Sequence, residues 1–176
     1  MQKPKTTASG NTFHHLRKAN NAVSDRLRVL LIDESQPLLD SLHQWLSLTN
    51  TVNIVGKVKS AVSALSMWES LMPDVIILCI PHDNEASTTV AHYLQAIKSL
   101  DPHVRIVLLV WDLPIIYRHS LPKFFKTLDA WMLKQNVCED LLPVLSKLFP
   151  NRVPLYDPLA SKATSLTSGE DFARPV

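Results

Sequence analysis

Four side chains that could take part in chemistry lie in or directly after apolar runs of the sequence. Asp33 and Glu34 follow LRVLLI, Cys79 lies near the end of DVIILCI, and Lys134 follows AWML. Two adjacent carboxylates can bind a divalent cation through hard oxygen ligands, or they can form a salt bridge with a lysine. A cysteine can act as a nucleophile or a redox sensor when its thiol ionises. For the acidic pair we expect the salt bridge with Lys134.

Apolar runs predict the strands that would position these side chains. The runs show little alternation between apolar and polar residues, which is typical of strands buried on both faces of a parallel sheet. They cover residues 27–32, 52–58, 74–80, 104–110 and 130–133.

Stretches with apolar residues at helical spacing follow each of these runs. Ser35 can cap the first helix, and Pro37 suits its first turn. Pro122 predicts a kink or an early end of the fourth helix, because proline interrupts helical hydrogen bonding. The predicted helices cover about 36–48, 60–72, 88–100, 114–127 and 137–149, and a polar loop covers 81–87.

Alternating strands and helices imply parallel strands joined by right-handed crossovers. We therefore predict an α/β fold, a (βα)5 doubly wound five-stranded parallel sheet, within residues 27–149. In such sheets, functional groups collect at the carboxyl ends of the strands. The residues predicted there are Asp33, Glu34, Cys79, Val110, Trp111, Asp112 and Lys134.

The order and spacing of these segments resemble the receiver domain of bacterial response regulators, and within that family the NarL/LuxR type. The resemblance implies a flavodoxin-like receiver fold and a role in two-component signal transduction, not an enzyme activity. It spans about residues 27–149 and rests on RVLLIDESQPLLDSLHQWL, VNIVGKVKSAVSAL, MPDVIILCI, LDPHVRIVLLV and LDAWMLKQN.

The resemblance also implies roles for single residues at the strand ends. Asp33 and Glu34 match the acidic pair that holds Mg²⁺ in the family. Lys134 matches the lysine that pairs with the phosphoryl group as a point charge. Trp131 matches the aromatic switch position, where Tyr or Phe is usual.

Three positions depart from the family pattern. Cys79 stands where the family has its phosphate-accepting aspartate, and Val110 stands where a Ser or Thr holds the phosphoryl oxygen. Pro81 follows Cys79 by two residues, whereas the family's proline follows the aspartate by four, so the geometry of the metal loop changes. We predict that phosphoryl transfer is lost and that no cofactor is needed, with residual Mg²⁺ binding at Asp33 and Glu34 as the alternative.

The sequence leaves the reactivity of Cys79 open. Lys134 would lower the pKa of its thiol, whereas Asp33 and Glu34 would raise it, so no direction follows. We expect a buried and unreactive cysteine, and keep a redox sensor as the alternative. A disulfide with Cys138, near the same edge of the predicted sheet, has weaker support.

The function that these features favour is a binding module that holds one conformation and acts through protein contacts. The expected surface is the face built by the fourth helix, the fifth strand and the last helix, used for a protein partner or a homodimer. Trp111 and Trp131 lie near it, and an exposed aromatic ring would suit such a contact. The alternative is a receiver with unusual input, through redox chemistry at Cys79 or a residual metal site.

Composition excludes several other classes. The 176 residues, 46% of them hydrophobic, suffice for one domain plus tails. Three glycines leave little scope for glycine-rich phosphate loops. No apolar run approaches the roughly 20 residues of a membrane span, and no signal peptide is visible. We therefore expect a cytoplasmic protein.

Both ends of the sequence differ from the middle. Residues 1–26 hold five basic residues and one acidic residue and predict a disordered basic tail. Residues 150–176 predict a flexible C-terminal tail without the helix-turn-helix domain that normally follows in NarL/LuxR-type regulators. Direct DNA binding is therefore not expected.

Overall fold

Five parallel strands form one sheet in the order β2-β1-β3-β4-β5. This arrangement, with helices on both faces, confirms the predicted α/β fold. The computed structural model describes residues 26–79, 84–111 and 127–154. The strands are β1 (Leu27–Ile32), β2 (Val52–Val58), β3 (Val75–Cys79), β4 (Arg105–Val110) and β5 (Ala130–Leu133).

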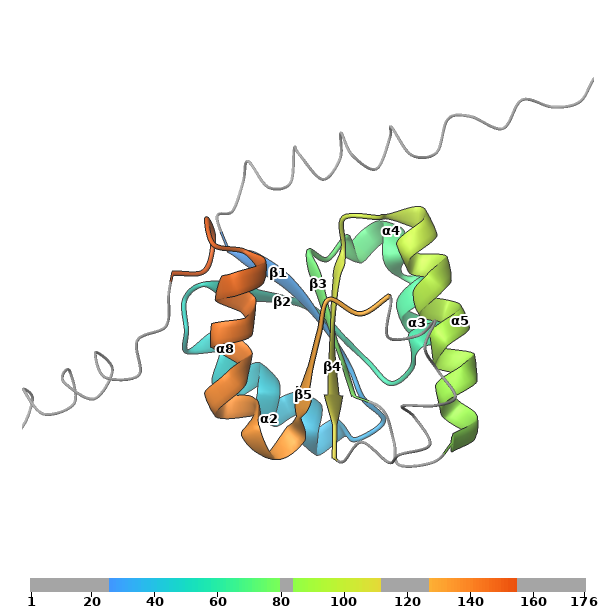
Figure 1. The fold of residues 1–176 in the computed structure, drawn as a ribbon, viewed down its shortest axis with the longest axis horizontal. Coiled ribbons are helices and arrows are strands. Elements are labelled where there is room, and N and C mark those ends of the chain that lie inside the picture. The colour runs from blue at the N-terminus through green and yellow to red at the C-terminus, as the bar shows by residue number, and fades with distance from the viewer. Residues whose placement is uncertain (1–25, 80–83, 112–126, 155–176) are drawn as a thin grey trace, which may run out of the picture.

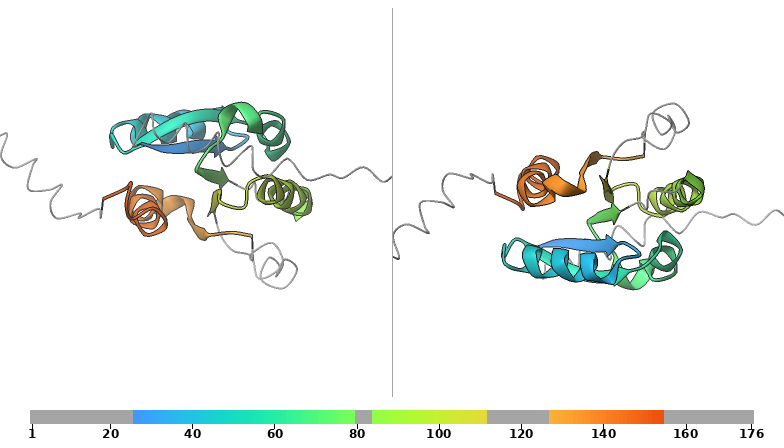
Figure 2. Two further views of the ribbon diagram at one scale, coloured as in Figure 1. Left: turned by 90° about the horizontal axis from the view of Figure 1, so that it is seen from above. Right: turned by 90° about the horizontal axis from the view of Figure 1, so that it is seen from below.

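Helices cover both faces of the sheet (Figure 1). One face carries α2 (Gln36–Ser47) and α8 (Val137–Leu148), and the short 3-10 helix η1 (Lys134–Asn136) leads from β5 into α8. The other face carries α3 (Ala61–Ser66), α4 (Trp68–Leu71) and α5 (Asn84–Leu100). Figure 2 shows α8 and α5 on opposite sides of the central strands. The helix predicted over 114–127 falls almost wholly outside the described residues.

Side chains of the central strands alternate between two hydrophobic cores, because successive residues of a strand point to opposite faces. In β3, Val75, Ile77 and Cys79 pack in the core shared with α2 and α8. Ile76 and Leu78 pack in the core shared with α3, α4 and α5. With both faces buried, the strand needs no polar positions, which explains its unbroken apolar sequence.

The single helix predicted over 60–72 is wrong, because two helices meet at Met67. Apolar residues keep helical spacing across this junction, so periodicity alone does not reveal the break. Two serine hydroxyls bond to backbone carbonyls nearby: Ser66 donates to Val62 and Ser70 donates to Met67. Side chains that compete for backbone groups in this way disfavour a continuous helix.

The loop predicted over 81–87 is also wrong in its second half, since α5 begins at Asn84. The first large apolar residue of this helix is Val90. The preceding turns therefore carry no apolar stripe from which a helix could be predicted.

The packed region continues past its predicted end at residue 149. Val153 is only 3% exposed and belongs to the core beneath α8. Arg152 fixes this segment, because its guanidinium lies 2.7 Å from a carboxylate oxygen of Asp74 and donates to the carbonyl of Arg26. Pro150 ends the helix but not the packing. Of the predicted tails, 1–26 and 150–176, all but residue 26 and residues 150–154 lie outside the described part of the chain. The described helices include none with the length and apolar character of a membrane span.

Asp129 ties the start of β5 to its neighbours at the amino end of the sheet. One carboxylate oxygen accepts from Arg105 at 2.7 Å. The other accepts from Lys98 at 3.0 Å and from the backbone N–H of Ile106 at 2.8 Å. The Asp129 side chain is 11% exposed, and its contacts with Lys98 and Ile106 are partly shielded from water, whereas Arg105 is 47% exposed.

We expect Asp129 to make stability depend on pH. Burial alone would raise the pKa of its carboxyl, but the N–H of Ile106 and the cations of Lys98 and Arg105 outweigh it and hold that pKa below its usual range. A group with a lowered folded pKa contributes stability above its unfolded pKa and loses it as pH falls through the folded one. Urea unfolding of Asp129→Asn should show a deficit at pH 7 that closes below about pH 4. A deficit independent of pH would contradict this role.

Candidate functional site

The carboxyl end of the sheet brings together side chains far apart in the sequence. Ile32 of β1 pairs with Leu78 of β3, which places Asp33 beside Cys79. Lys134 comes directly after β5, and its Nζ lies 3.1 Å from Oδ2 of Asp33. The two side chains are 8% and 7% exposed. The result is a buried ion pair next to the thiol.

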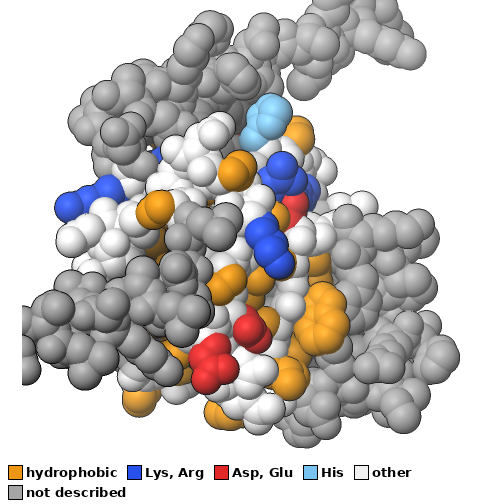
Figure 3. Space-filling view, turned by 60° about the vertical axis from the view of Figure 1, so that its left-hand side comes forward, with side chains coloured by type: hydrophobic (Ala, Val, Ile, Leu, Met, Phe, Trp, Pro, Cys, Tyr) orange, Lys and Arg blue, Asp and Glu red, His pale blue; other side chains and the backbone are white. Residues whose placement is uncertain are grey.

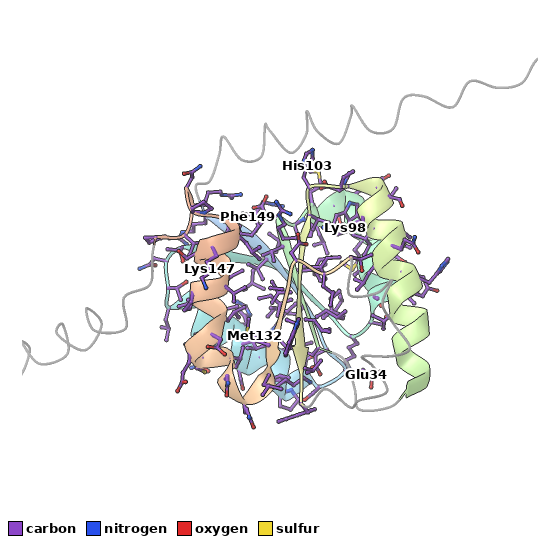
Figure 4. All side chains as sticks on the ribbon, in the orientation of Figure 1. Glu34, Lys98, His103, Met132, Lys147 and Phe149 are labelled. Carbon is purple, nitrogen blue, oxygen red and sulfur yellow. The ribbon has the colours of Figure 1, made fainter. Side chains whose placement is uncertain are left out.

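The two acidic residues behave differently. Asp33 uses both oxygens, because Oδ2 faces Lys134 and Oδ1 accepts from the backbone N–H of Ser35 at 2.6 Å. Glu34 is exposed and forms no ion pair or hydrogen bond within the described part of the chain. Figure 4 shows Glu34 at the carboxyl end of the sheet, opposite to the end that holds Lys98 and His103. The expected salt bridge with Lys134 therefore involves Asp33 alone.

Cys79 is a buried, neutral thiol in this structure. It is 4% exposed. Burial raises its pKa well above the usual range, and the adjacent Asp33 raises it further by accepting a hydrogen bond and by its charge. Lys134 lowers the pKa but by less than burial raises it. The thiolate, which is the reactive form, is therefore scarce at neutral pH.

We expect the two cysteines to differ in reactivity. Both are free thiols, with Cys79 buried and Cys138 exposed at the start of α8. In the native protein a chromogenic disulfide reagent should label one thiol per chain, and this label should disappear in Cys138→Ser. Cys79 should react only after denaturant is added. Rapid native labelling in Cys138→Ser would show that Cys79 is accessible and ionised.

Trp111 completes the surroundings of the lysine. It follows β4 directly, and its ring centroid lies 5.3 Å from Nζ of Lys134, within the range of a cation–π contact. The Trp111 side chain is nevertheless 60% exposed. The sequence placed Trp111 at the correct edge of the sheet but did not predict its contact with Lys134. The available signal was its position immediately after a buried strand.

A cleft of about 530 Å³ opens above this group of residues. Its volume falls within the range of small-molecule sites in proteins. The walls come from the loop after β1, the first turns of α2 and the residues that follow β4 and β5. The lining residues are Asp33, Glu34, Ser35, Pro37, Leu38, Ser41, Trp111 and Lys134.

The two predicted switch positions differ in their surroundings. Val110 follows Leu109, the residue that pairs with Cys79 on β3, but its side chain faces the other side of the sheet. Val110 is 7% exposed and packs in the core with α3, α4 and α5, whereas Cys79 packs in the opposite core. Trp131 on β5 is 48% exposed. Neither Trp111 nor Trp131 is therefore a core residue. Pro81 and Asp112 lie outside the described residues.

The residues at this end of the sheet do not fit a Mg²⁺ site. Mg²⁺ requires hard oxygen ligands in near-octahedral geometry. Both oxygens of Asp33 already accept from protein donors. The neighbouring residue, Cys79, offers a neutral thiol and not a carboxylate. Within the described ranges, no group of three His, Cys, Asp or Glu side chains is placed to hold a metal. Among the described residues at this end of the sheet, Glu34 alone remains as an unpaired carboxylate.

Known structures share this fold at low sequence identity. No protein-family model matches the sequence, and no curated protein matches it. The receiver domain of RcsB from Salmonella enterica serovar Typhimurium in the apo form is 17% identical, with a TM-score of 0.60 over 80% of this chain and 99% of that one. The signal receiver domain of the response regulator NarL from Mycobacterium tuberculosis is 22% identical, with a TM-score of 0.56 over 73% and 100%. The predicted receiver fold is thereby confirmed.

Proposed function

We propose, from this receiver fold, that the chain is a signalling module of two-component type that works without phosphorylation and acts through protein contacts. The observation that carries the proposal is the burial of Cys79 at the end of β3, where it is 4% exposed, and this burial raises the pKa of its thiol. This is the position where the family resemblance implies a phosphate-accepting aspartate. A cofactor is not part of the proposed function.

Two steps of phosphoryl signalling lack a group that they need, and a third would have to break an ion pair. The usual acyl phosphate requires a carboxylate, and Cys79 supplies a neutral thiol. Lys134 would have to leave the carboxylate of Asp33, 3.1 Å away, to pair with a phosphoryl oxygen. Val110 has no hydroxyl to bond such an oxygen and is packed in the hydrophobic core. The fold itself does not need these groups, because its strands are held by hydrophobic packing on both faces.

The proposed contact surface is centred on β5, an edge strand of the sheet. Trp131 lies on this strand with nearly half of its side chain exposed, and large aromatic residues often dominate binding energy at interfaces. Figure 3, with the α8 side turned forward, shows hydrophobic side chains exposed among acidic and basic ones. The fourth helix of the predicted face lies outside the described residues, so β5 and α8 define the surface here. We propose a cytoplasmic partner, or a second copy of the chain.

A pull-down with tagged full-length protein tests this proposal. Trp131→Ala should weaken capture of the specific partner by about tenfold or more. Leu48→Ala is the matched control, because Leu48 is 77% exposed at the end of α2, away from β5. Sedimentation of the same variants would detect a homodimer. Partner binding that requires acetyl phosphate, or that is equal in wild type and Trp131→Ala, would contradict the proposal.

Input through Cys79 oxidation or a metal is the alternative function. A redox sensor needs an accessible thiol with a lowered pKa, and Cys79 has neither property. Partner binding that changes after mild oxidation, in wild type but not in Cys79→Ser, would nevertheless favour this alternative.

A further inference from the structure

In the cleft beside the Lys134–Asp33 pair, some polar groups already have partners within the protein and others do not. Among the described residues that line the cleft, Lys134 carries the one cation, and its ammonium contacts Asp33 at 3.1 Å and the ring of Trp111. Its side chain is only 8% exposed. An anionic ligand would have to compete with both contacts to reach it.

The groups that remain unused in the cleft can accept hydrogen bonds. The carboxylate of Glu34 is exposed and has no ion pair or hydrogen bond in the described part of the chain. The hydroxyl of Ser35 makes no capping bond to α2. Because Asp33 and Lys134 neutralise each other, the described lining residues carry a net negative charge from Glu34.

Trp111 adds an aromatic face to these acceptors. One part of the ring contacts Lys134, and 60% of the side chain is open to solvent. A carboxylate together with an aromatic face is a combination that attracts organic cations. Pro37 and Leu38 supply apolar surface for a carbon skeleton.

The positive end of α2 lies at the same cleft and would by itself favour an anion. Two features weaken that effect. Proline occupies the first turn of α2 and removes one backbone donor, and the N–H of Ser35 is already used by Asp33. The helix end therefore offers few free donors to an anionic group.

We propose that this cleft binds a small organic amine, with the ammonium group against Glu34 and the ring of Trp111. The assignment goes beyond the proposed function and does not depend on it, because a phosphorylation-independent module could have this cleft filled or empty. The chemical class is an aromatic or aliphatic ammonium small enough for about 530 Å³.

Benzylamine is the probe for this site, read out by the indole N–H resonance of Trp111 in the full-length protein. Loss of that resonance in Trp111→Phe assigns it. Benzylamine should shift it in a saturable manner, whereas neutral benzyl alcohol and anionic benzoate should shift it weakly or not at all. Glu34→Gln should weaken benzylamine binding by about tenfold or more. Glu69→Gln, which removes an exposed charge from α4 instead, should leave it unchanged.

Three results would overturn the assignment. They are an equal response to benzyl alcohol or benzoate, unchanged affinity in a folded Glu34→Gln variant, and the absence of a saturable shift. Binding of a lysine-containing peptide without binding of benzylamine would overturn it as well, since the cation would then belong to a macromolecular partner. The partner pull-down is unaffected by any of these results, so the two proposals fail independently.

Discussion

Replacing Cys79 with aspartate is expected to lower the free energy of unfolding at neutral pH by about 2–4 kcal/mol. The new carboxyl would be buried and would stand beside Asp33, so its pKa would be raised in the folded state. An acid with a raised folded pKa costs nothing below its unfolded pKa, and the cost grows as pH rises through that value. The deficit should therefore be small near pH 4 and large at pH 7 in urea unfolding. Cys79→Ser, which adds no charge, should show no such pH dependence.

Mg²⁺ provides a second measurement on the same variant. Cys79→Asp would place three carboxylates at the strand ends, whereas the natural chain offers one exposed carboxylate and one engaged by Lys134. Mg²⁺ should raise the melting temperature of Cys79→Asp and leave that of wild type unchanged. A comparable increase in wild type would show that Asp33 and Glu34 bind Mg²⁺ in the natural chain. It would contradict the conclusion that these residues do not fit a Mg²⁺ site.

Replacing Asp74 with alanine is expected to lower the free energy of unfolding by about 3–5 kcal/mol. Asp74 is 2% exposed, and its Oδ2 accepts from the backbone N–H of Arg28 at 2.9 Å and from the guanidinium of Arg152 at 2.7 Å. Without this carboxylate, the N–H of Arg28 and the guanidinium of Arg152 would lose their acceptor, and the segment that carries Val153 would no longer be held in place. Chemical denaturation of the purified variant measures the change.

Asp40→Ala is the matched control for this experiment. Asp40 also pairs with a cation, Lys57, at 2.6 Å, but it lies on the surface with 55% of its side chain exposed. Solvent screening makes such pairs contribute little, so the control should unfold nearly as wild type does. Similar losses in the two variants would mean that the Asp74 contacts do not fix the end of the domain.

Buried strands made most of this fold predictable from the sequence. DVIILCI and RIVLLV are apolar on both faces, and their placement between helical stretches indicates a parallel sheet. Helix ends were harder to place, because hydrogen bonds of single polar side chains decide them. The serines flanking Met67 divide a stretch whose apolar spacing is continuous. Arg152 likewise extends the packed region through its ion pair with Asp74, which cannot be predicted from apolar periodicity.

The members of the site and the ion pair between Asp33 and Lys134 were predictable from the sequence, whereas the protonation of Cys79 and the contact of Trp111 were not. The order of the strands explains why Asp33, Cys79 and Lys134 meet, because the carboxyl ends of parallel strands share one edge. The protonation of Cys79 depends on burial and the adjacent Asp33, which raise the pKa of its thiol, weighed against the charge of Lys134, which lowers it, and that balance needs coordinates. The contact between Trp111 and Lys134 depends on side-chain direction after β4 and β5.

In the function that we propose, the receiver fold is kept while phosphoryl chemistry is absent. The cores on both faces hold the sheet, and Lys134 and Asp33 pair with each other at the strand ends. Contacts made by the edge strand then become the means of signalling that we propose.

Incubation with acetyl phosphate and Mg²⁺, followed by intact-mass measurement, tests the central claim most directly. The account predicts no gain of a phosphoryl group in wild type, while a response regulator with an intact acceptor aspartate gains one in the same reaction. A stable phosphorylated form of wild type that disappears in Cys79→Ser would contradict the account.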